Sequence, residues 1–114
     1  MSDFADHLHD VFRLFGPIEV RRMFGGHGIY REGVMFALLA GETLYLKADA
    51  RNAPAFRKRG LAQFEYHRKG KAAKLSYYAA PEIVMEDSTE AARWARSSFE
   101  AALRGLEAKR TSRR

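Results

Sequence analysis

Apolar side chains recur every three or four residues near the N-terminus, from Phe4 to Phe15. This spacing predicts an amphipathic helix over residues 3–15 with an apolar stripe along one side. Gly16 and Pro17 then end the helix, because glycine accepts the conformation that follows a helix and proline cannot continue one.

The same spacing returns in the C-terminal third, where an apolar stripe runs from Ala91 to Leu106. Asp87 and Glu90 stand three residues apart just before it, a weaker, Asp-led form of the capping box that opens helices. No large apolar side chain follows Leu106. We therefore expect a folded domain over residues 1–106 and a basic, disordered tail over residues 107–114.

Between these helices the pattern changes to short runs that alternate or are wholly apolar, as in strands. Residues 34–39 are apolar without a break, which is typical of a central strand, and Gly41 with Glu42 suits a two-residue hairpin turn. A second, shorter helix is predicted over residues 49–59, where Pro54 fits the first turn. The predicted strands span residues 19–24, 29–31, 34–39, 43–47, 64–68 and 74–80.

This order of elements predicts an α+β fold. We expect two layers, in which the N- and C-terminal helices cover one face of an antiparallel sheet of about five to six strands. The length of 114 residues and the 46% hydrophobic share fit one ordinary globular domain.

The net charge is +6, and it is unevenly distributed. Residues 51–74 hold eight Lys or Arg against a single Glu, whereas residues 1–15 and 82–100 are locally acidic. A basic stretch attracts nucleic acid, anionic lipid or an acidic protein surface, although a solvated charge face is the simpler interpretation.

The basic stretch flanks an aromatic strand that contains Phe64 and Tyr66. Such a mixture can bind nucleic acid, since cations hold phosphates and rings stack on bases. The simpler interpretation is that the rings are buried and the cations are solvated. The candidate nucleic-acid contacts are Arg57, Lys58, Arg59, Arg68, Lys69, Lys71 and Lys74.

A glycine-rich segment breaks the first part of the predicted sheet. Glycine loops bring backbone N–H groups close to phosphates, but such a cradle opens into a helix, and here a strand is predicted. We favour a structural turn or bulge with positive φ and keep contact with a ligand or partner as the alternative. The candidate contacts at this segment are Arg21, Arg22, Gly25, Gly26, His27 and Gly28.

Tyr45 and Tyr78 lie on predicted strands. If helices cover one face of the sheet, we expect Tyr45 or Tyr78 to be exposed on the other. Exposed aromatic side chains on a sheet often mark a partner surface. The hypothesis is a protein partner or a homodimer at this face.

Several classes of protein are disfavoured. The absence of cysteine excludes disulfides, cysteine metal sites and thiol nucleophiles, and it fits the reducing cytoplasm. No signal peptide or membrane-spanning apolar stretch is recognisable. His7 and His9 face different directions on a helix, and no nucleophile elbow or carboxylate pair appears. We therefore expect no metal, no cofactor and no catalytic residue, and keep an uncharacterised small-molecule enzyme in reserve.

Three segments and one tryptophan resemble those of a known family. Residues 22–30, RMFGGHGIY, look like the glycine-rich opening of the N-terminal domain of the TfoX/Sxy competence regulators, with Arg21 as a second candidate for its arginine. Residues 44–49, LYLKAD, are similar to another of its segments. Residues 75–81, LSYYAAP, resemble a third, although a leucine stands where methionine is common, and Trp94 matches a tryptophan of the last helix.

The resemblance runs from about residue 3 to residue 104 and implies a compact α+β layer. Full-length members are positive regulators of DNA-uptake competence, thought to work with the cyclic-AMP receptor protein at promoters. This chain ends where their helical C-terminal domain would begin, so it resembles their N-terminal domain alone. We therefore expect a non-enzymatic regulatory or binding module, in competence or transcription regulation through protein contacts. Direct nucleic-acid binding is the alternative.

Overall fold

The computed structural model describes residues 3–23 and 25–112. Its strands are β1 (Glu19–Met23), β2 (Gly26–Arg31), β3 (Val34–Ala40), β4 (Thr43–Lys47), β5 (Gln63–Arg68) and β6 (Lys71–Ala79). Its helices are α1 (Asp3–Val11), α2 (Ala53–Lys58), α3 (Ile83–Glu86) and α4 (Ser88–Ser112).

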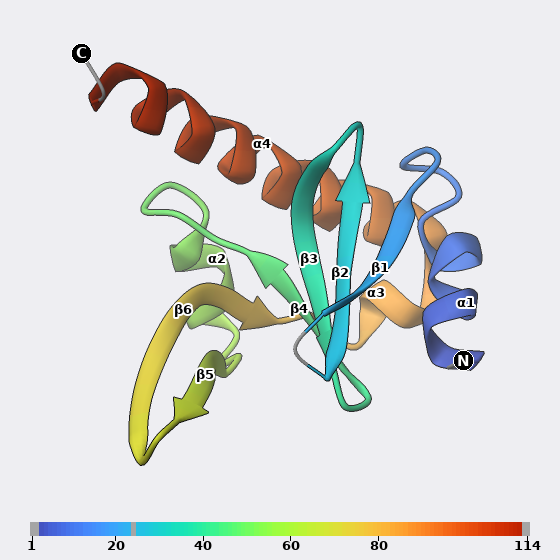
Figure 1. The fold of residues 1–114 in the computed structure, drawn as a ribbon. Coiled ribbons are helices and arrows are strands. Elements are labelled where there is room, and N and C mark those ends of the chain that lie inside the picture. Colours follow the sequence, from blue (N-terminus) through green and yellow to red (C-terminus); the bar gives the residue numbers. More distant parts are fainter. Residues whose placement is uncertain (1–2, 24, 113–114) are drawn as a thin grey trace.

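The six strands form one antiparallel sheet in the order β1-β2-β3-β4-β6-β5, so β1 and β5 are its edges. The long helix α4 crosses one face and packs on β3 and β4, while α3 and α1 lie beside its N-terminal half (Figure 1). The predicted α+β fold, with an antiparallel sheet and helices at both ends of the chain, is confirmed.

Strand alternation decides which side chains meet the helices. Leu39, Leu44 and Leu46 are buried on the helix-covered face, and their neighbours in the chain point to the other face. A bulge between β2 and β3 interrupts the alternation at residue 36, because Ile29 pairs with residue 37 and Tyr30 with residue 35. The bulge lets both Phe36 and Ala37 be fully buried.

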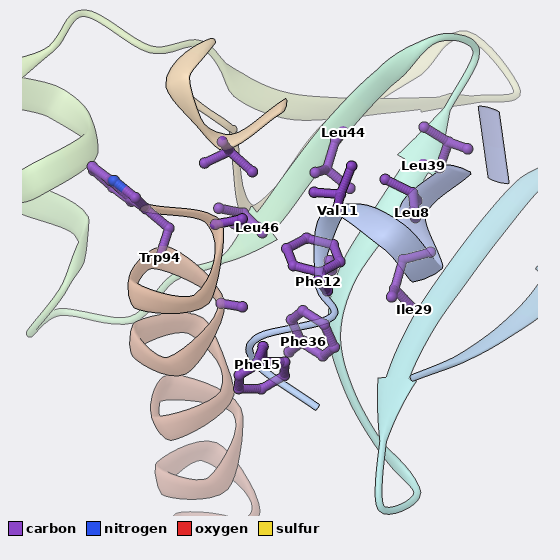
Figure 2. Close-up of a cluster of buried hydrophobic side chains, with 14 of the residues drawn as sticks. Leu8, Val11, Phe12, Phe15, Ile29, Phe36, Leu39, Leu44, Leu46 and Trp94 are labelled. Carbon is purple, nitrogen blue, oxygen red and sulfur yellow. The ribbon is translucent and has the colours of Figure 1, made fainter. Parts of the chain in front are cut away.

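Aromatic rings fill the centre of the core. Phe12 and Phe15 lie in the turns that follow α1, and their rings meet that of Phe36 in β3 at centroid distances of 5.5 and 5.1 Å (Figure 2). Phe15 also meets Phe99 of α4 at 5.9 Å. The apolar stripe predicted for the first helix therefore joins the sheet to the last helix, although the helix itself ends earlier than predicted.

Small side chains line the buried side of α4. The buried residues on this helix include Ala91, Ala95, Ser98, Ala101 and Ala102. Small residues let a helix approach a sheet closely, which leaves room for the phenylalanine rings beside it. Trp94, 7% exposed, is the large buried side chain of this helix, and its ring lies 5.2 Å from that of Phe56.

The element boundaries differ from the predictions where local hydrogen bonds compete. The first helix gives way to turns after Val11, in which the N–H groups of Phe15 and Gly16 donate to the carbonyl of Phe12. Residues 49–52 form a turn before α2, not its first turn. β2 begins inside the glycine segment at Gly26, and β6 begins at Lys71, so the glycines do not break the sheet where the sequence predicted.

Helix α4 continues past Leu106 to Ser112, whereas the sequence predicted disorder from residue 107. Residues 107–110, EAKR, are good helix formers, and Glu107 lies 3.7 Å from Arg110 one turn later. Local propensity therefore favours the continuation of the helix (Figure 1). Arg113 and Arg114 of the predicted tail lie outside the described residues.

Asp49 fastens the connection after β4 to α4. Its carboxylate accepts the backbone N–H groups of Arg51 and Asn52 at 3.0 and 3.2 Å and pairs with Arg104 at 2.6 and 3.0 Å. The hydrogen bond from Arg104 lowers the pKa of Asp49 to about 2. Asn52 adds a second link, since its amide donates to the Lys47 carbonyl and to the Ser97 hydroxyl.

We predict that Asp49→Asn lowers the free energy of unfolding by about 1–2 kcal/mol at pH 7. A depressed carboxyl pKa stabilises the fold above its ordinary value of 3.8, and this contribution disappears as the pH falls towards about 2. Urea unfolding from pH 2 to pH 7 should show the two proteins converging at low pH.

Asp10→Asn is the matched control, because the Asp10–Arg13 pair is exposed and its atoms lie 3.5 Å apart. We expect this control to change stability by less than about 0.5 kcal/mol at any pH. Equal losses for both variants, or a constant gap between Asp49→Asn and the parent protein, would contradict the role of the Asp49–Arg104 pair.

Candidate binding surface on the open sheet face

The sheet face opposite the helices contains an apolar groove with a volume of about 230 Å³. Met23, Met35 and Leu38 line it from the sheet. Its other wall comes from the β5–β6 hairpin, through Phe64, Tyr66, Leu75 and Tyr77. Leu75 is 38% exposed, so the groove offers an apolar surface to solvent.

The short pairing between β4 and β6 creates this groove. The two strands pair only from Tyr45–Ala79 to Lys47–Tyr77. Residues 71–76 of β6 extend past β4 as an exposed hairpin with β5, which curves away from the rest of the sheet (Figure 1). Side chains of the hairpin and of β3 therefore face each other across the groove instead of packing fully together.

Two cations lie over aromatic rings of this face. The Lys47 ammonium is 5.1 Å from the ring centre of Tyr77, and the Arg21 guanidinium is 4.6 Å from that of Tyr30. Burial lowers the pKa of Lys47 below its ordinary value, and the Asp49 carboxylate offsets only part of this effect. Burial, with a smaller contribution from Tyr30, raises the pKa of Tyr77 to about 12, so its hydroxyl stays protonated at neutral pH.

The glycine segment has structural reasons for its composition. Gly25 has a φ of +77°, which disfavours any other residue. A Cβ at Gly26 would lie 2.2 Å from the Leu39 carbonyl oxygen, and one at Gly28 would lie 2.7 Å from the Met23 sulfur. These contacts support the structural interpretation of the segment. Phe24 of the same motif lies outside the described residues.

The other candidates at this segment divide between the two sheet faces. Arg21 lies on the open face, where its guanidinium donates to Glu19 at 3.0 and 3.1 Å. Arg22 is the next residue of β1 and points to the opposite face. His27 is half-buried and borders the groove, but it pairs with Arg22 and Leu39, so its side chain points to the same face as theirs. Of this set, Arg21 is therefore the one whose side chain the register places on the open face.

The expectation for the two tyrosines is corrected by strand alternation. Tyr78 is 5% exposed and lies on the helix-covered face, where its ring stacks on Phe56 at 5.3 Å. Tyr45 is on the open face but half-buried, with its ring 4.8 Å from that of Phe64. Tyr77, not Tyr78, is the member of the pair that lines the groove.

The predicted basic residues form two separate groups. In α2, Arg57 donates to the Tyr78 hydroxyl at 3.1 Å and Lys58 is exposed, while Arg59, just after α2, lies 5.2 Å from the Trp94 ring centre. Lys69 and Lys71 lie at the far turn of the β5–β6 hairpin, and Arg68 is the β5 residue that pairs with Lys71 (Figure 1). Lys74 is exposed on β6 opposite Glu65.

Among residues 3–23 and 25–112, no three His, Cys, Asp or Glu side chains gather closely enough to hold a metal ion. Over the same ranges, no helix has both the length and the apolar character required to cross a membrane.

The groove residues Met23, Met35, Leu38 and Leu75 were not predicted from the sequence. The sequence feature that could have indicated them is the unbroken apolar run in β3, because a strand of this kind needs cover on both faces. The sequence could indicate two-sided cover, but not that a distant hairpin supplies it incompletely.

We predict that Gly26→Ala destabilises the protein by about 3 kcal/mol or more, because its Cβ would overlap a backbone carbonyl that cannot rotate away. Gly25→Ala should cost about 1–2 kcal/mol through its positive φ alone. Gly105→Ala, in an open position of α4, should stabilise by about 0.5–1 kcal/mol. Urea unfolding of the three variants would measure this order, and a Gly26→Ala as stable as Gly25→Ala would contradict it.

Sequence comparisons relate this chain to known proteins. The family model of the TfoX N-terminal domain matches residues 10–102. DNA transformation protein TfoX1 of Aliivibrio fischeri is 26% identical over 83 residues, which cover 73% of this chain and 40% of that protein. Protein Sxy of Escherichia coli strain K12 is 27% identical over 99 residues, which cover 87% of this chain and 47% of that protein.

The chain thus spans less than half the length of the curated relatives that it matches. The matched region contains the whole sheet, the glycine segment and most of α4. On this match, the chain belongs to the TfoX N-terminal domain family.

Proposed function

We propose that this chain is a non-enzymatic, cytoplasmic regulatory module that binds a protein partner in the groove of its open sheet face. The observation that carries the proposal is the groove itself, an apolar surface of about 230 Å³ formed by methionine, leucine and aromatic side chains. Methionine side chains adapt to different shapes, which suits a surface that receives another protein's side chains.

Charge defines the partner's chemistry. Arg21 and Lys47 lie on the face that contains the groove, and Lys71 stands at the turn of its outer wall. The whole chain has a net charge of +6. We expect a partner segment with apolar side chains that enter the groove and carboxylates that flank them.

The non-enzymatic part of the proposal is supported by the chemistry of the groove. Its titratable lining consists of His27, Tyr66 and Tyr77. The raised pKa of Tyr77, about 12, leaves that hydroxyl protonated and unsuited to act as a base at neutral pH. A regulatory role in DNA uptake is supported by family membership and by the name of the A. fischeri relative.

We predict that Leu75→Glu abolishes this function while leaving the fold intact. A charge at a central apolar contact should weaken partner binding by about 2 kcal/mol or more, roughly 30-fold. Ile83→Glu is the matched control, since Ile83 on α3 is 37% exposed and Leu75 is 38% exposed. The measurement is the transcript profile of a host that lacks the gene, complemented with each variant.

The wild type and Ile83→Glu should restore the transcripts, and Leu75→Glu should not. Circular dichroism and thermal midpoints confirm that both variants fold. Full restoration by a folded Leu75→Glu protein would overturn the groove as the functional surface.

Nucleic-acid binding through the basic residues is the alternative. We predict that Lys58→Ala/Lys69→Ala restores the transcripts, because these side chains lie away from the groove lining. We also expect random duplex DNA to bind more weakly than about 10 μM at physiological salt. A tighter affinity with a steep salt dependence, lost in the Lys58→Ala/Lys69→Ala variant together with the transcripts, would favour the alternative.

A further inference from the structure

Strand β1 is a free and regular edge of the sheet. It occupies the outer position, and β2 is the one element among the described residues with which it makes extensive contact (Figure 1). Its five residues pair with β2 without a register shift. An edge strand of this kind presents an unpaired row of backbone N–H and C=O groups to solvent.

The other edge, β5, differs from β1. Its pairing with β6 contains an irregularity between Gln63 and Glu65. It also belongs to the hairpin that curves away from the sheet (Figure 1). Bulges and curvature are among the features that protect an edge from pairing with another chain, and the pairing of β1 with β2 contains no bulge.

The side chains of β1 are arranged so that the strand complements itself. Glu19 and Arg21 lie on one face, and Val20 stands between them. When two copies pair antiparallel about a two-fold axis at Val20, Glu19 of each copy lies directly opposite Arg21 of the other. Ile18 then lies opposite the aliphatic stem of Arg22 in the second copy.

Charge selects this register over its neighbours. In such a symmetric pair, directly opposite residues share a face, so the axis must pass through a residue. An axis at Glu19 would oppose two glutamates, and an axis at Arg21 or Arg22 would oppose two arginines. Like charges directly opposite each other destabilise a strand pair, whereas opposite charges stabilise it.

Two further features suit this pairing. Glu19 and Arg21 already form a bidentate pair within one strand at 3.0 and 3.1 Å, so a second copy would extend it into a network of four charges. Leu14, 57% exposed, is an apolar side chain on the segment that leads into β1.

We propose that two copies of this chain associate through antiparallel pairing of β1, centred on Val20, to form one continuous twelve-stranded sheet. The two-fold axis then runs perpendicular to the sheet, and the open faces of both copies point to the same side. If the groove binds a partner as proposed above, the dimer offers two grooves to one bivalent target. The pairing itself does not depend on that function.

Charge reversal tests the pairing in the full chain. Sedimentation equilibrium from about 5 to 500 μM should show a reversible dimer for the wild type, since a single strand pair buries a small interface. Glu19→Arg and Arg21→Glu should each raise the dimer dissociation constant at least about tenfold. Both side chains are more than half exposed, so both variants should keep the fold.

Recombining the charges provides the specific readout. An equimolar mixture of the two single variants should form a heterodimer, because each charge then meets its opposite. The double variant Glu19→Arg/Arg21→Glu should regain wild-type dimerisation. A wild type that stays monomeric up to 500 μM would overturn the proposal, as would single variants that dimerise normally or a mixture that stays monomeric.

The register has its own test, because the chain contains no cysteine. Val20→Cys places two thiols opposite each other across the axis and should give a disulfide-linked dimer under mild oxidation. Arg22→Cys is the control, since the pairing separates its two copies along the strands. Crosslinking of Arg22→Cys but not Val20→Cys would contradict the register, whereas failure of the groove variant Leu75→Glu would leave it unaffected.

Discussion

Strand β3 must be covered on both faces, and much of the molecule follows from this constraint. Phe36, Ala37 and Leu39 are buried on the helix-covered face, and Met35 and Leu38 point to the other. Burying an apolar side chain contributes about 1.5–3 kcal/mol, so neither face is stable when bare. The helices cover one face completely. The β5–β6 hairpin covers the other only in part, and the uncovered remainder is the groove.

The polar contacts around Asp49 serve the same constraint. Helix α4 packs on β3 and β4. Apolar burial is non-directional, so directed polar contacts specify its position along the sheet more sharply. The Asp49–Arg104 pair and the Asn52–Ser97 hydrogen bond fix two successive regions of α4 to the connection after β4. The aspartate of the family-like segment LYLKAD thus has a structural role, which does not require a ligand.

The proposed functions use the parts of the sheet that intramolecular packing leaves available. The groove is the face that the hairpin does not finish covering, and β1 is the edge whose pairing contains no bulge. Both lie away from α4, whose buried side packs on the sheet. Two glycines of β2 contribute to both regions. Gly26 lets β2 lie close to the Leu39 carbonyl of β3, and Gly28 leaves room for the Met23 side chain of β1.

The sequence by itself determined the types and order of the elements, except for the short helix α3, which was not predicted. Periods of two and of three to four residues are local properties, so the strands, the helices and the antiparallel connections were predictable. Boundaries failed where local hydrogen bonds compete, as after Val11 and before Ala53. The family motifs were also readable, because they are short and keep their spacing.

Only the tertiary structure decided which side chains share a surface. Tyr77 and Tyr78 are neighbours of the same type, and one bulge or register shift exchanges their faces. The groove joins residues of β1 and β3 to residues of β6 about forty or fifty positions later. Asp49 and Arg104 are likewise distant in the chain. No local pattern encodes such meetings, because they depend on where the sheet ends, how its hairpin curves and how α4 crosses it.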